Sequence, residues 1–451
     1  MEARNAAGSK AQALTAPTSA GLITSRHGTR WLMLLLVMLV MFVNYLDRGN
    51  LGIAAPVIQK SLNLDAVGLG LLFSAFAWTY LLCIPFAGVL LDKIGPRITL
   101  TLALIGWSAS TMITGIASSF IAILACRMCV GVFESPGIPT NIRCVSAWFP
   151  ESQRGIAIAG FTATQTVALG VMAPSLTWIL VNWGWRPVFY VTGALGLLMA
   201  IVWHRFYRDP SNSTLVSQEE LAFIRDGGGL VDAGTERDKV PFSWRHLRQL
   251  FRERQLIGMF IGQYAVMTTL YFFLTWFPSY LTKAKGLTIL QSGQYAIVPF
   301  LTAVFGALGG GKWSDWMVSR GVSRGVARKT PIIVGFVLAS SMVGANYTSD
   351  IRLVIALLGL AFFGQAMASA VTNVLLTDIA PRGAIGLTGG LLTFFANLGS
   401  ALSPLIVGFS VQLSGGFSLA LLYVSVVSAI GAAAYLFIVG KIKRIVLQPG
   451  A

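Results

Sequence analysis

Long apolar runs recur along the whole chain and are separated by short polar segments. Each run comes close to the ~20 residues that a helix needs to cross about 30 Å of hydrocarbon. Twelve runs meet this criterion, at 31–51, 67–91, 97–117, 120–147, 154–180, 187–205, 256–282, 292–318, 329–347, 352–378, 384–412 and 418–440. The pattern predicts an all-α polytopic membrane protein with 12 transmembrane helices.

The longest polar stretch falls between the sixth and the seventh run. We expect a six-helix N-terminal bundle at 31–205, a cytoplasmic linker at 206–254 and a six-helix C-terminal bundle at 255–440, with tails at 1–30 and 441–451. The first tail is rich in Ala, Ser, Thr and Gly, which predicts disorder. A linker with short surface helices is the simpler interpretation of 206–254, and a regulatory docking site is the alternative.

Composition and charge sharpen this picture. Charged residues make up only 11% of the chain, whereas a soluble domain carries about 25%. Of the 33 Lys and Arg residues, 26 fall in the tails and loops of one side and five in the loops of the other. This bias follows the positive-inside rule and predicts that both termini are cytoplasmic. Anionic lipid accounts for the net charge of +16, so a nucleic acid partner is not expected.

Four charged residues lie inside otherwise apolar spans: Asp47 and Arg48 in the first, and Arg127 and Glu134 in the fourth. A charge at the bilayer centre costs roughly 2.5–3.5 kcal/mol on insertion scales, so such residues face a protein interior or a cavity. Arg127 and Glu134 are seven residues apart, which places both on one side of their helix. Two interpretations stay open: a proton and anion site, or a structural network of ion pairs.

Several other classes of chemistry find no support. Cys126 and Cys129 resemble half of a redox or zinc site, but no second pair accompanies them, and we interpret both as packing residues. The glycines at 227–229 lack the Lys-Ser/Thr of a nucleotide loop. No nucleophile triad or metal cluster stands out in the sequence. We therefore expect neither an enzyme nor a cofactor, and a proton gradient rather than ATP as the driving force. A membrane sensor is a further alternative, but it would need a soluble output domain.

The two halves of the sequence repeat one loop pattern. Gly88-x-x-x-Asp92-Lys93-x-Gly95-x-Arg97 follows the second span, and Gly311-x-x-Ser314-Asp315 with Arg320-Gly321 follows the eighth. The first loop resembles the signature loop of the major facilitator superfamily, a fold of two pseudo-symmetric six-helix bundles that rock around a midplane site. The resemblance implies a charge latch at Asp92, Arg97, Asp315 and Arg320. A helix stop combined with positive-inside charge is the simpler alternative.

A narrower resemblance rests on five segments: 44–48 (NYLDR), 127–136 (Arg127, Glu134 and Pro136), 262–264 (GQY), 272–278 (FFLTWFP) and 386–390 (GLTGG). Together they resemble the anion:cation symporter family, and most of all its bacterial galactonate, glucarate and hexuronate permeases. The resemblance implies proton-coupled import of a sugar acid across the bacterial inner membrane, by a carrier expected to be monomeric. It implies that Asp47 and Glu134 couple protons and that Arg48 holds the substrate carboxylate. Arg127 would partner one of the two acids, and hydroxyl recognition would fall to Tyr45, Tyr80, Gln165 and Gln263.

The second half departs from that family pattern. Asn373, beside Thr372, stands where the galactonate and glucarate branches tend to have Trp, and Thr393 stands where they have Asn. Asn397 follows Thr393 by about one turn and is expected to compensate. These positions face substrate in the family, so the anion chemistry is better defined than the identity of the acid. An anion exchanger or uniporter without proton coupling is the alternative function.

Overall fold

The computed structural model describes residues 28–231, 244–381 and 385–447, which form helices joined by short loops, with no strand in these ranges. The predicted tail at 1–30 therefore lies almost wholly outside the described residues, as do positions 232–243 of the predicted linker. The first half begins with α1 (Thr29–Ser61) and continues through α2 (Ala66–Ile116), α3 (Phe120–Glu134), α4 (Gly137–Trp148), α5 (Glu151–Trp183) and α6 (Trp185–Phe206).

The second half has the same number of long segments, several of them interrupted. Its helices are α9 (Arg254–Tyr271), the π-helix η2 (Phe272–Trp276), α10 (Phe277–Lys283), α11 (Ile289–Ser319), α12 (Arg324–Ser340), the 3-10 turn η3 (Ser341–Asn346), α13 (Ile351–Ile379), α14 (Ile385–Ser414), α15 (Ser418–Ala433) and the π-helix η4 (Ala434–Ile438). The first three of these run on as one apolar span, Arg254–Lys283.

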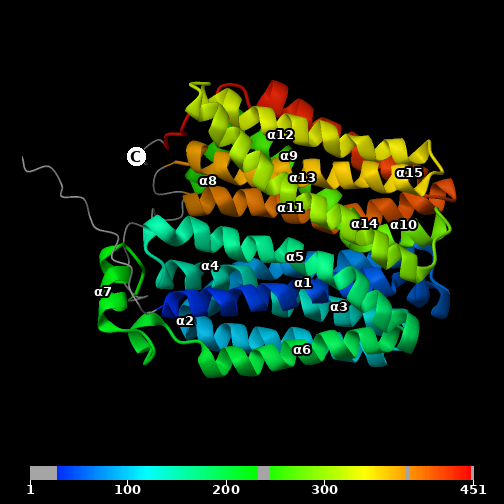
Figure 1. The fold of residues 1–451 in the computed structure, drawn as a ribbon, viewed down its shortest axis with the longest axis horizontal. Coiled ribbons are helices and arrows are strands. Elements are labelled where there is room, and N and C mark those ends of the chain that lie inside the picture. Colours follow the sequence, from blue (N-terminus) through cyan, green and yellow to red (C-terminus); the bar gives the residue numbers. More distant parts are fainter. Residues whose placement is uncertain (1–27, 232–243, 382–384, 448–451) are drawn as a thin grey trace, which may run out of the picture.

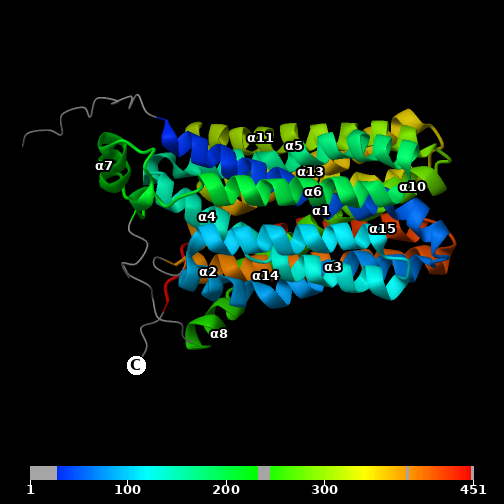
Figure 2. The same ribbon diagram turned by 90° about the horizontal axis from the view of Figure 1, so that it is seen from below.

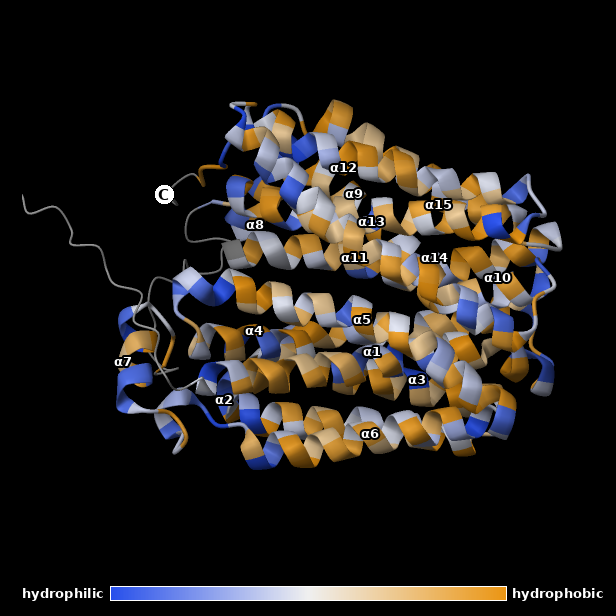
Figure 3. Ribbon diagram, viewed as in Figure 1, coloured by the Kyte–Doolittle hydropathy of each residue, from blue (hydrophilic) through white to orange (hydrophobic). Residues whose placement is uncertain are grey.

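Within the described residues, 11 helices are long and apolar enough to cross a membrane. They cover all 12 predicted spans because α2, with 51 residues, contains two of them. Gly95 separates the two parts of α2 with a φ of 75°, a conformation that glycine adopts at little cost, and Pro96 follows. Figure 3 shows that apolar residues predominate along the long helices and that polar residues gather at their ends.

The halves form two parallel layers of helices (Figure 1), with α1–α6 in one and α9–α15 in the other. We name the end of the molecule that carries α7 (Gln218–Asp226) and α8 (Trp244–Arg252) the linker end. The opposite end, with loops at 62–65 and 284–288, is the far end. Across the interface, α2 packs on α14 and α5 on α11, while α1 packs on η2 and α10.

The described parts of the linker are divided between the halves. Glu220 of α7 is fully buried and accepts hydrogen bonds from the backbone nitrogens of Thr29 and Arg30, at 3.2 Å each, and from Arg30 Nη1 at 2.9 Å. A carboxylate here stabilises the N-terminus of α1, whose first N–H groups lack helical partners. On the other side, Gln249 of α8 donates to the carbonyl oxygen of Val446. Thus α7 belongs to the first half and α8 to the second.

Close packing joins the halves at the far end. A Cβ on Gly52 of α1 would clash with the carbonyl oxygen of Leu274, and one on Gly70 would meet that of Pro404. The Lys283 ammonium donates to Gln59 Oε1 at 2.5 Å, and the Val67 amide donates to Gln412 Oε1 at 3.3 Å. Among the described residues, the hydrogen bonds between the halves lie at this end or, as for the Ser74 hydroxyl and the Ala401 carbonyl, nearer the middle. The conformation is therefore closed at the far end.

Candidate functional site

The centre of the first half contains a buried ion pair between α1 and α3. Arg48 Nε donates to Glu134 Oε2 at 2.8 Å, and their side chains are 9% and 0% exposed. Breaking such a pair by removing one partner is expensive, because the other charge is left uncompensated in a low-dielectric interior. The second carboxylate oxygen, Glu134 Oε1, has no hydrogen-bond partner among the described residues. Glu134 Oε1 can therefore accept a hydrogen bond from a further ligand or bind a proton.

Aromatic rings surround the Arg48 guanidinium. Its Cζ lies 5.3 Å from the ring centroid of Tyr45, 5.1 Å from that of Phe76 and 5.0 Å from that of Tyr80. The negative faces of aromatic rings attract a cation and shield it from other polar groups. The structure therefore brings together Tyr45, Arg48, Tyr80 and Glu134, four of the residues singled out in the sequence.

Arg127 lies on the same face of α3 as Glu134, as their spacing predicted, and both are buried. Its Nη1 donates to the backbone carbonyl oxygen of Asp47 at 3.4 Å, and its Cζ lies 5.5 Å from the Phe76 ring. Its Nε has no partner among the described residues. Arg127 thus bonds the backbone of Asp47, and no carboxylate of the described residues lies within ion-pair distance of it.

The carboxylate of Asp47 faces α6, away from Arg48. It is fully buried, and its Oδ1 accepts a 3.5 Å hydrogen bond from Asn50 Nδ2, which also donates to Thr192 Oγ1 of α6 at 3.1 Å. Its Oδ2 has no hydrogen-bond partner among the described residues. The 100° turn between adjacent helical residues explains the division: Arg48 faces the aromatic cluster and Asp47 faces the interior of the first half. Asp47 and Glu134 therefore occupy different environments.

The second half contributes polar groups from α9. Gln263 is 7% exposed, and its Oε1 has no partner among the described residues. Tyr271, the last residue of α9, is buried and lies within electrostatic range of Arg48 and Glu134. It directly precedes η2, and π-helical turns occur often at functional sites. Sequence reasoning missed Tyr271, whose only sequence signal is its place just before the segment 272–278.

Two more polar groups near the acids escaped the sequence argument. Asn44 and Asn50 are both buried on α1, three residues before and three residues after Asp47. Helical spacing puts positions three and four apart on neighbouring parts of one surface, so this spacing was a usable signal. A third buried amide, Asn141, lies seven residues beyond Glu134, with both of its polar atoms unpartnered among the described residues.

The remaining predicted substrate residues are more dispersed. Gln165 is half-buried on α5, and Thr372 is buried on α13, where its hydroxyl pairs with Tyr435 at 3.0 Å. Asn373 is exposed on the adjacent position. On α14, Thr393 is exposed and Asn397 half-buried, and they bond within their own helix, to the carbonyl oxygens of Gly389 and Thr393. In this conformation, Thr372 serves packing within the second half.

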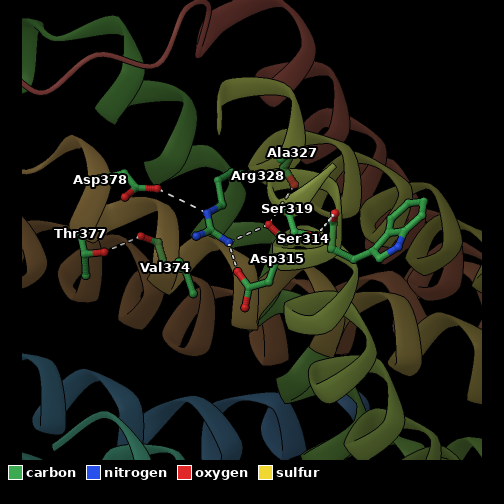
Figure 4. Close-up of polar contacts among 9 residues, drawn as sticks. Ser314, Asp315, Ser319, Ala327, Arg328, Val374, Thr377 and Asp378 are labelled. Carbon is green, nitrogen blue, oxygen red and sulfur yellow. Dashed lines mark hydrogen bonds and ion pairs between the residues drawn. The ribbon is translucent and has the colours of Figure 1, made fainter. Parts of the chain in front are cut away.

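The four predicted latch residues lie at the linker end, each paired within its own half. Asp92 Oδ1 accepts from Arg143 Nη1 at 3.2 Å, and Arg97 donates to the His204 carbonyl oxygen. In the second half, Arg328 bonds Asp315 at 2.8 Å and Asp378 at 3.4 Å (Figure 4). Arg320 lies over the Trp316 ring. The ion pairs of Asp92 and Asp315 with bases of their own half are consistent with a linker end that is not latched across the interface.

The described ranges contain no group of three or more His, Cys, Asp or Glu residues placed to hold a metal ion. The polar centre instead consists of two acids, two arginines, amides and tyrosines. Such a set can exchange protons and bind a carboxylate.

Comparison with known proteins identifies relatives that match more than nine-tenths of the chain. Residues 37–326 match the family model of the Major Facilitator Superfamily. The chain is 42% identical over 419 residues to the D-galactonate transporter of Escherichia coli, covering 92% of this chain and 97% of that protein. It is 38% identical to the probable galactarate/D-glucarate transporter GudP of Bacillus subtilis, covering 96% of each chain.

Solved structures agree on the fold. A bacterial homologue of the human lysosomal transporter Spinster, in an inward-facing and occupied conformation, superposes with a TM-score of 0.72 at 19% identity. The match covers 90% of this chain and 96% of that chain. At this level of identity, the likeness concerns the fold alone.

Proposed function

The chain belongs to the major facilitator superfamily and to its sugar-acid permease branch, so it is a multi-pass membrane transporter and not an enzyme; from this premise we propose proton-coupled symport of a sugar acid into the cell. The substrate would be an aldonate, an aldarate or a uronate. The relatives named for galactonate, galactarate and glucarate support this class. The predicted location is the bacterial inner membrane, with the linker end toward the cytoplasm.

The observation that carries the proposal is the ion pair of Arg48 with Glu134. A guanidinium binds a carboxylate with two parallel hydrogen bonds, and Glu134 occupies one side of it at 2.8 Å. A substrate carboxylate must compete with Glu134 for that donor. Protonation of Glu134 removes the competing charge and frees Arg48 for the substrate. Binding of the anion and binding of the proton then favour one another, which is the requirement for symport.

Asp47 would supply a second proton site on the interior side of α1. Its bond to Asn50, which also reaches Thr192, ties its orientation to the packing of α1 on α6. Arg127, bonded to the backbone carbonyl of Asp47 and seven residues before Glu134 on α3, would be the base that pairs with one of the two acids when protonation changes. Protonation of both acids would lower the cost of closing the site around an anion, since a buried charge must otherwise be compensated.

Selection of the acid would fall to uncharged groups. Tyr45 and Tyr80 beside Arg48, together with Gln165, Gln263 and Tyr271, offer hydroxyl and amide partners for the hydroxyls of a sugar acid. The exposed Asn373 and Thr393 are the positions where this chain departs from the galactonate and glucarate pattern. We assign specificity among sugar acids to this second group, and Thr372 and Asn397 would support it.

Transport would proceed by rocking of the two halves. The closed far end, with Gly52 packed on Leu274, supports an arrangement in which substrate leaves at the linker end. The Asp92 and Asp315 pairs would exchange partners across the interface when the linker end closes. The carrier is expected to act as a monomer, without a cofactor.

Uptake into proteoliposomes tests the function. Purified protein would be reconstituted with no internal anion, and uptake of labelled galactonate and glucarate measured with an acidic exterior. We expect accumulation that collapses when a protonophore is added. Uptake that required an internal anion, or that was insensitive to the pH gradient, would favour exchange or uniport instead. If the Asp47→Asn variant kept full uphill uptake with an unchanged pH profile, Asp47 would have no role in proton coupling.

A further inference from the structure

An apolar groove of about 280 Å³ lies on the second half at its linker end. It is lined by Phe251, Ile257, Phe260, Ile261, Tyr264 and Phe395, from α8, α9 and α14. The one hydroxyl among these side chains, that of Tyr264, bonds the Tyr423 hydroxyl at 3.0 Å. The side chains that line the groove therefore present apolar surface, and their one hydroxyl already has a partner. Such a groove suits a hydrocarbon chain.

The walls of the groove are fixed by aromatic packing. The rings of Phe260 and Phe395 stack with centroids 4.4 Å apart. The centroid of the Phe251 ring lies 6.1 Å from that of Phe260 and 6.2 Å from that of Phe395. Phe251 and Ile257 are nonetheless 41% and 36% exposed. Leu250, the neighbour of Phe251, is fully buried against α9 and thus anchors α8 in place. Because the wall is preformed, the protein itself loses little conformational freedom when an apolar chain binds.

The position of α8 puts the groove where a membrane surface would meet the protein. Figure 2 shows α8 at the linker end, on the outer flank of the bundle beside α14. A short helix with one apolar and one basic face lies in the interface between headgroups and acyl chains. Here Leu250 is buried against the protein, and Arg248 and Arg252, four residues apart, are exposed on one face of α8.

Four exposed cations gather at this rim: Arg248, Arg252, Arg254 and Lys443. Lys443 is brought here because its backbone nitrogen donates to Gln255 Oε1 at 2.9 Å while Gln255 Nε2 donates to the Lys443 carbonyl oxygen at 3.1 Å. No carboxylate of the described residues forms an ion pair with any of the four, although Glu253 is near in sequence. With four cations and the one nearby carboxylate of Glu253, the rim carries a net positive charge.

We propose that α8, α9 and α14 form a binding site for a diacyl phospholipid with an anionic headgroup. One acyl chain lies in the groove, and the phosphate is held by Arg248 and Arg252. Arginine suits this task because its planar fork matches phosphate oxygens. The charge of the rim favours an anionic lipid over a zwitterionic one of the same chain length. Because α8 is the last part of the linker and packs on the second half, the bound lipid would stabilise this attachment. The proposal stands independently of the transported substrate and of proton coupling.

The test is a lipid titration of delipidated protein in detergent, read as the shift of the melting temperature. Phosphatidylglycerol is compared with phosphatidylcholine of identical acyl chains, and lipid retained after gel filtration is counted by native mass spectrometry. We expect phosphatidylglycerol to raise the melting temperature by several degrees more than phosphatidylcholine and to remain bound. Equal shifts for the two lipids would overturn the proposal.

Variants separate the headgroup from the groove. Arg248→Gln with Arg252→Gln is expected to weaken phosphatidylglycerol binding about 30-fold, which corresponds to about 1 kcal/mol for each arginine. Ile257→Trp fills the groove and is expected to abolish retention of the lipid. The matched control, Arg205→Gln with Arg324→Gln, removes two exposed charges elsewhere at the linker end and should bind as the wild type does.

Three outcomes count against the site. The first is unchanged phosphatidylglycerol binding in the Arg248/Arg252 variant. The second is an equal loss in the control variant, which would point to charge in general and not to the groove. The third is that the wild type retains no lipid, whereas a variant with residues 232–243 replaced by a Gly-Ser linker does, which would make that segment the occupant of the groove. Melting temperatures without lipid establish that each variant is folded.

Discussion

Arg48 Nε donates to Glu134 Oε2 at 2.8 Å, and this bond joins α1 to α3 at the centre of the first half. The guanidinium that would bind a substrate carboxylate is thus held by an acid that can give up its charge. The relationship links anion binding to protonation within one contact. It also means that substitution of either residue changes two functions at once.

Glu134→Gln should separate binding from coupling. The amide removes the negative charge that competes for Arg48 and cannot be ionised, so the site resembles its protonated form. We expect sugar-acid affinity equal to or above the wild-type value, substrate exchange across the membrane that is retained, and uphill uptake reduced at least ~10-fold. Isothermal titration and proteoliposome assays measure the two properties. Weaker binding together with intact uphill uptake would contradict the assigned role.

Arg48→Lys keeps the charge and loses the planar fork. A lysine offers a point charge and cannot make two parallel bonds to a carboxylate, so we expect sugar-acid affinity to fall about 10–100-fold, or roughly 1.4–2.8 kcal/mol. Arg48→Ala should bind more weakly still, because Glu134 then keeps a buried charge without its partner. Binding by the lysine variant at wild-type strength would show that charge alone suffices.

Gly52→Val should block closure of the far end. A Cβ at this position clashes with the Leu274 carbonyl oxygen, so the two halves cannot approach as they do in this conformation. We expect uphill uptake to be lost while substrate binding persists. Labelling of Gln59→Cys with a membrane-impermeant reagent would report a far end that stays open. Gly155→Val is the control, since a Cβ at Gly155 meets nothing within 4 Å and should leave transport largely intact.

Glu220→Gln should loosen α7 from the first half. Glu220 is fully buried and accepts three hydrogen bonds, one of them from the Arg30 guanidinium at 2.9 Å. Loss of its charge leaves Arg30, which is 7% exposed, without a carboxylate and should destabilise the protein by about 2–4 kcal/mol. Thermal unfolding in detergent measures the change. The neighbouring Glu219 is exposed, and Glu219→Gln should change stability by less than about 0.5 kcal/mol.

The fold was predictable because length and hydropathy suffice for spanning helices. The break at Gly95 was also readable, since Gly95-Pro96 falls between two apolar runs within the one helix α2. The spacing of Arg127 and Glu134 correctly placed both on one face of α3. By contrast, the sequence predicted only that Arg127 pairs with one of the two acids. In the structure, Arg127 donates to the backbone carbonyl of Asp47 instead. Side-chain reach and the crossing of α1 and α3 decide such a contact, and neither has a local sequence signal.

The sequence by itself determined the class of the protein, its spans and the identity of its central charges, since burial of a charge in an apolar helix is costly wherever the helix lies. Tertiary structure alone decided that Arg48 meets Glu134 while Asp47 turns to Asn50 and Thr192. It alone placed Tyr271 near the pair and joined Phe251, Phe260 and Phe395 into one groove. These relationships depend on how helices distant in sequence pack, and helical periodicity describes only one helix at a time.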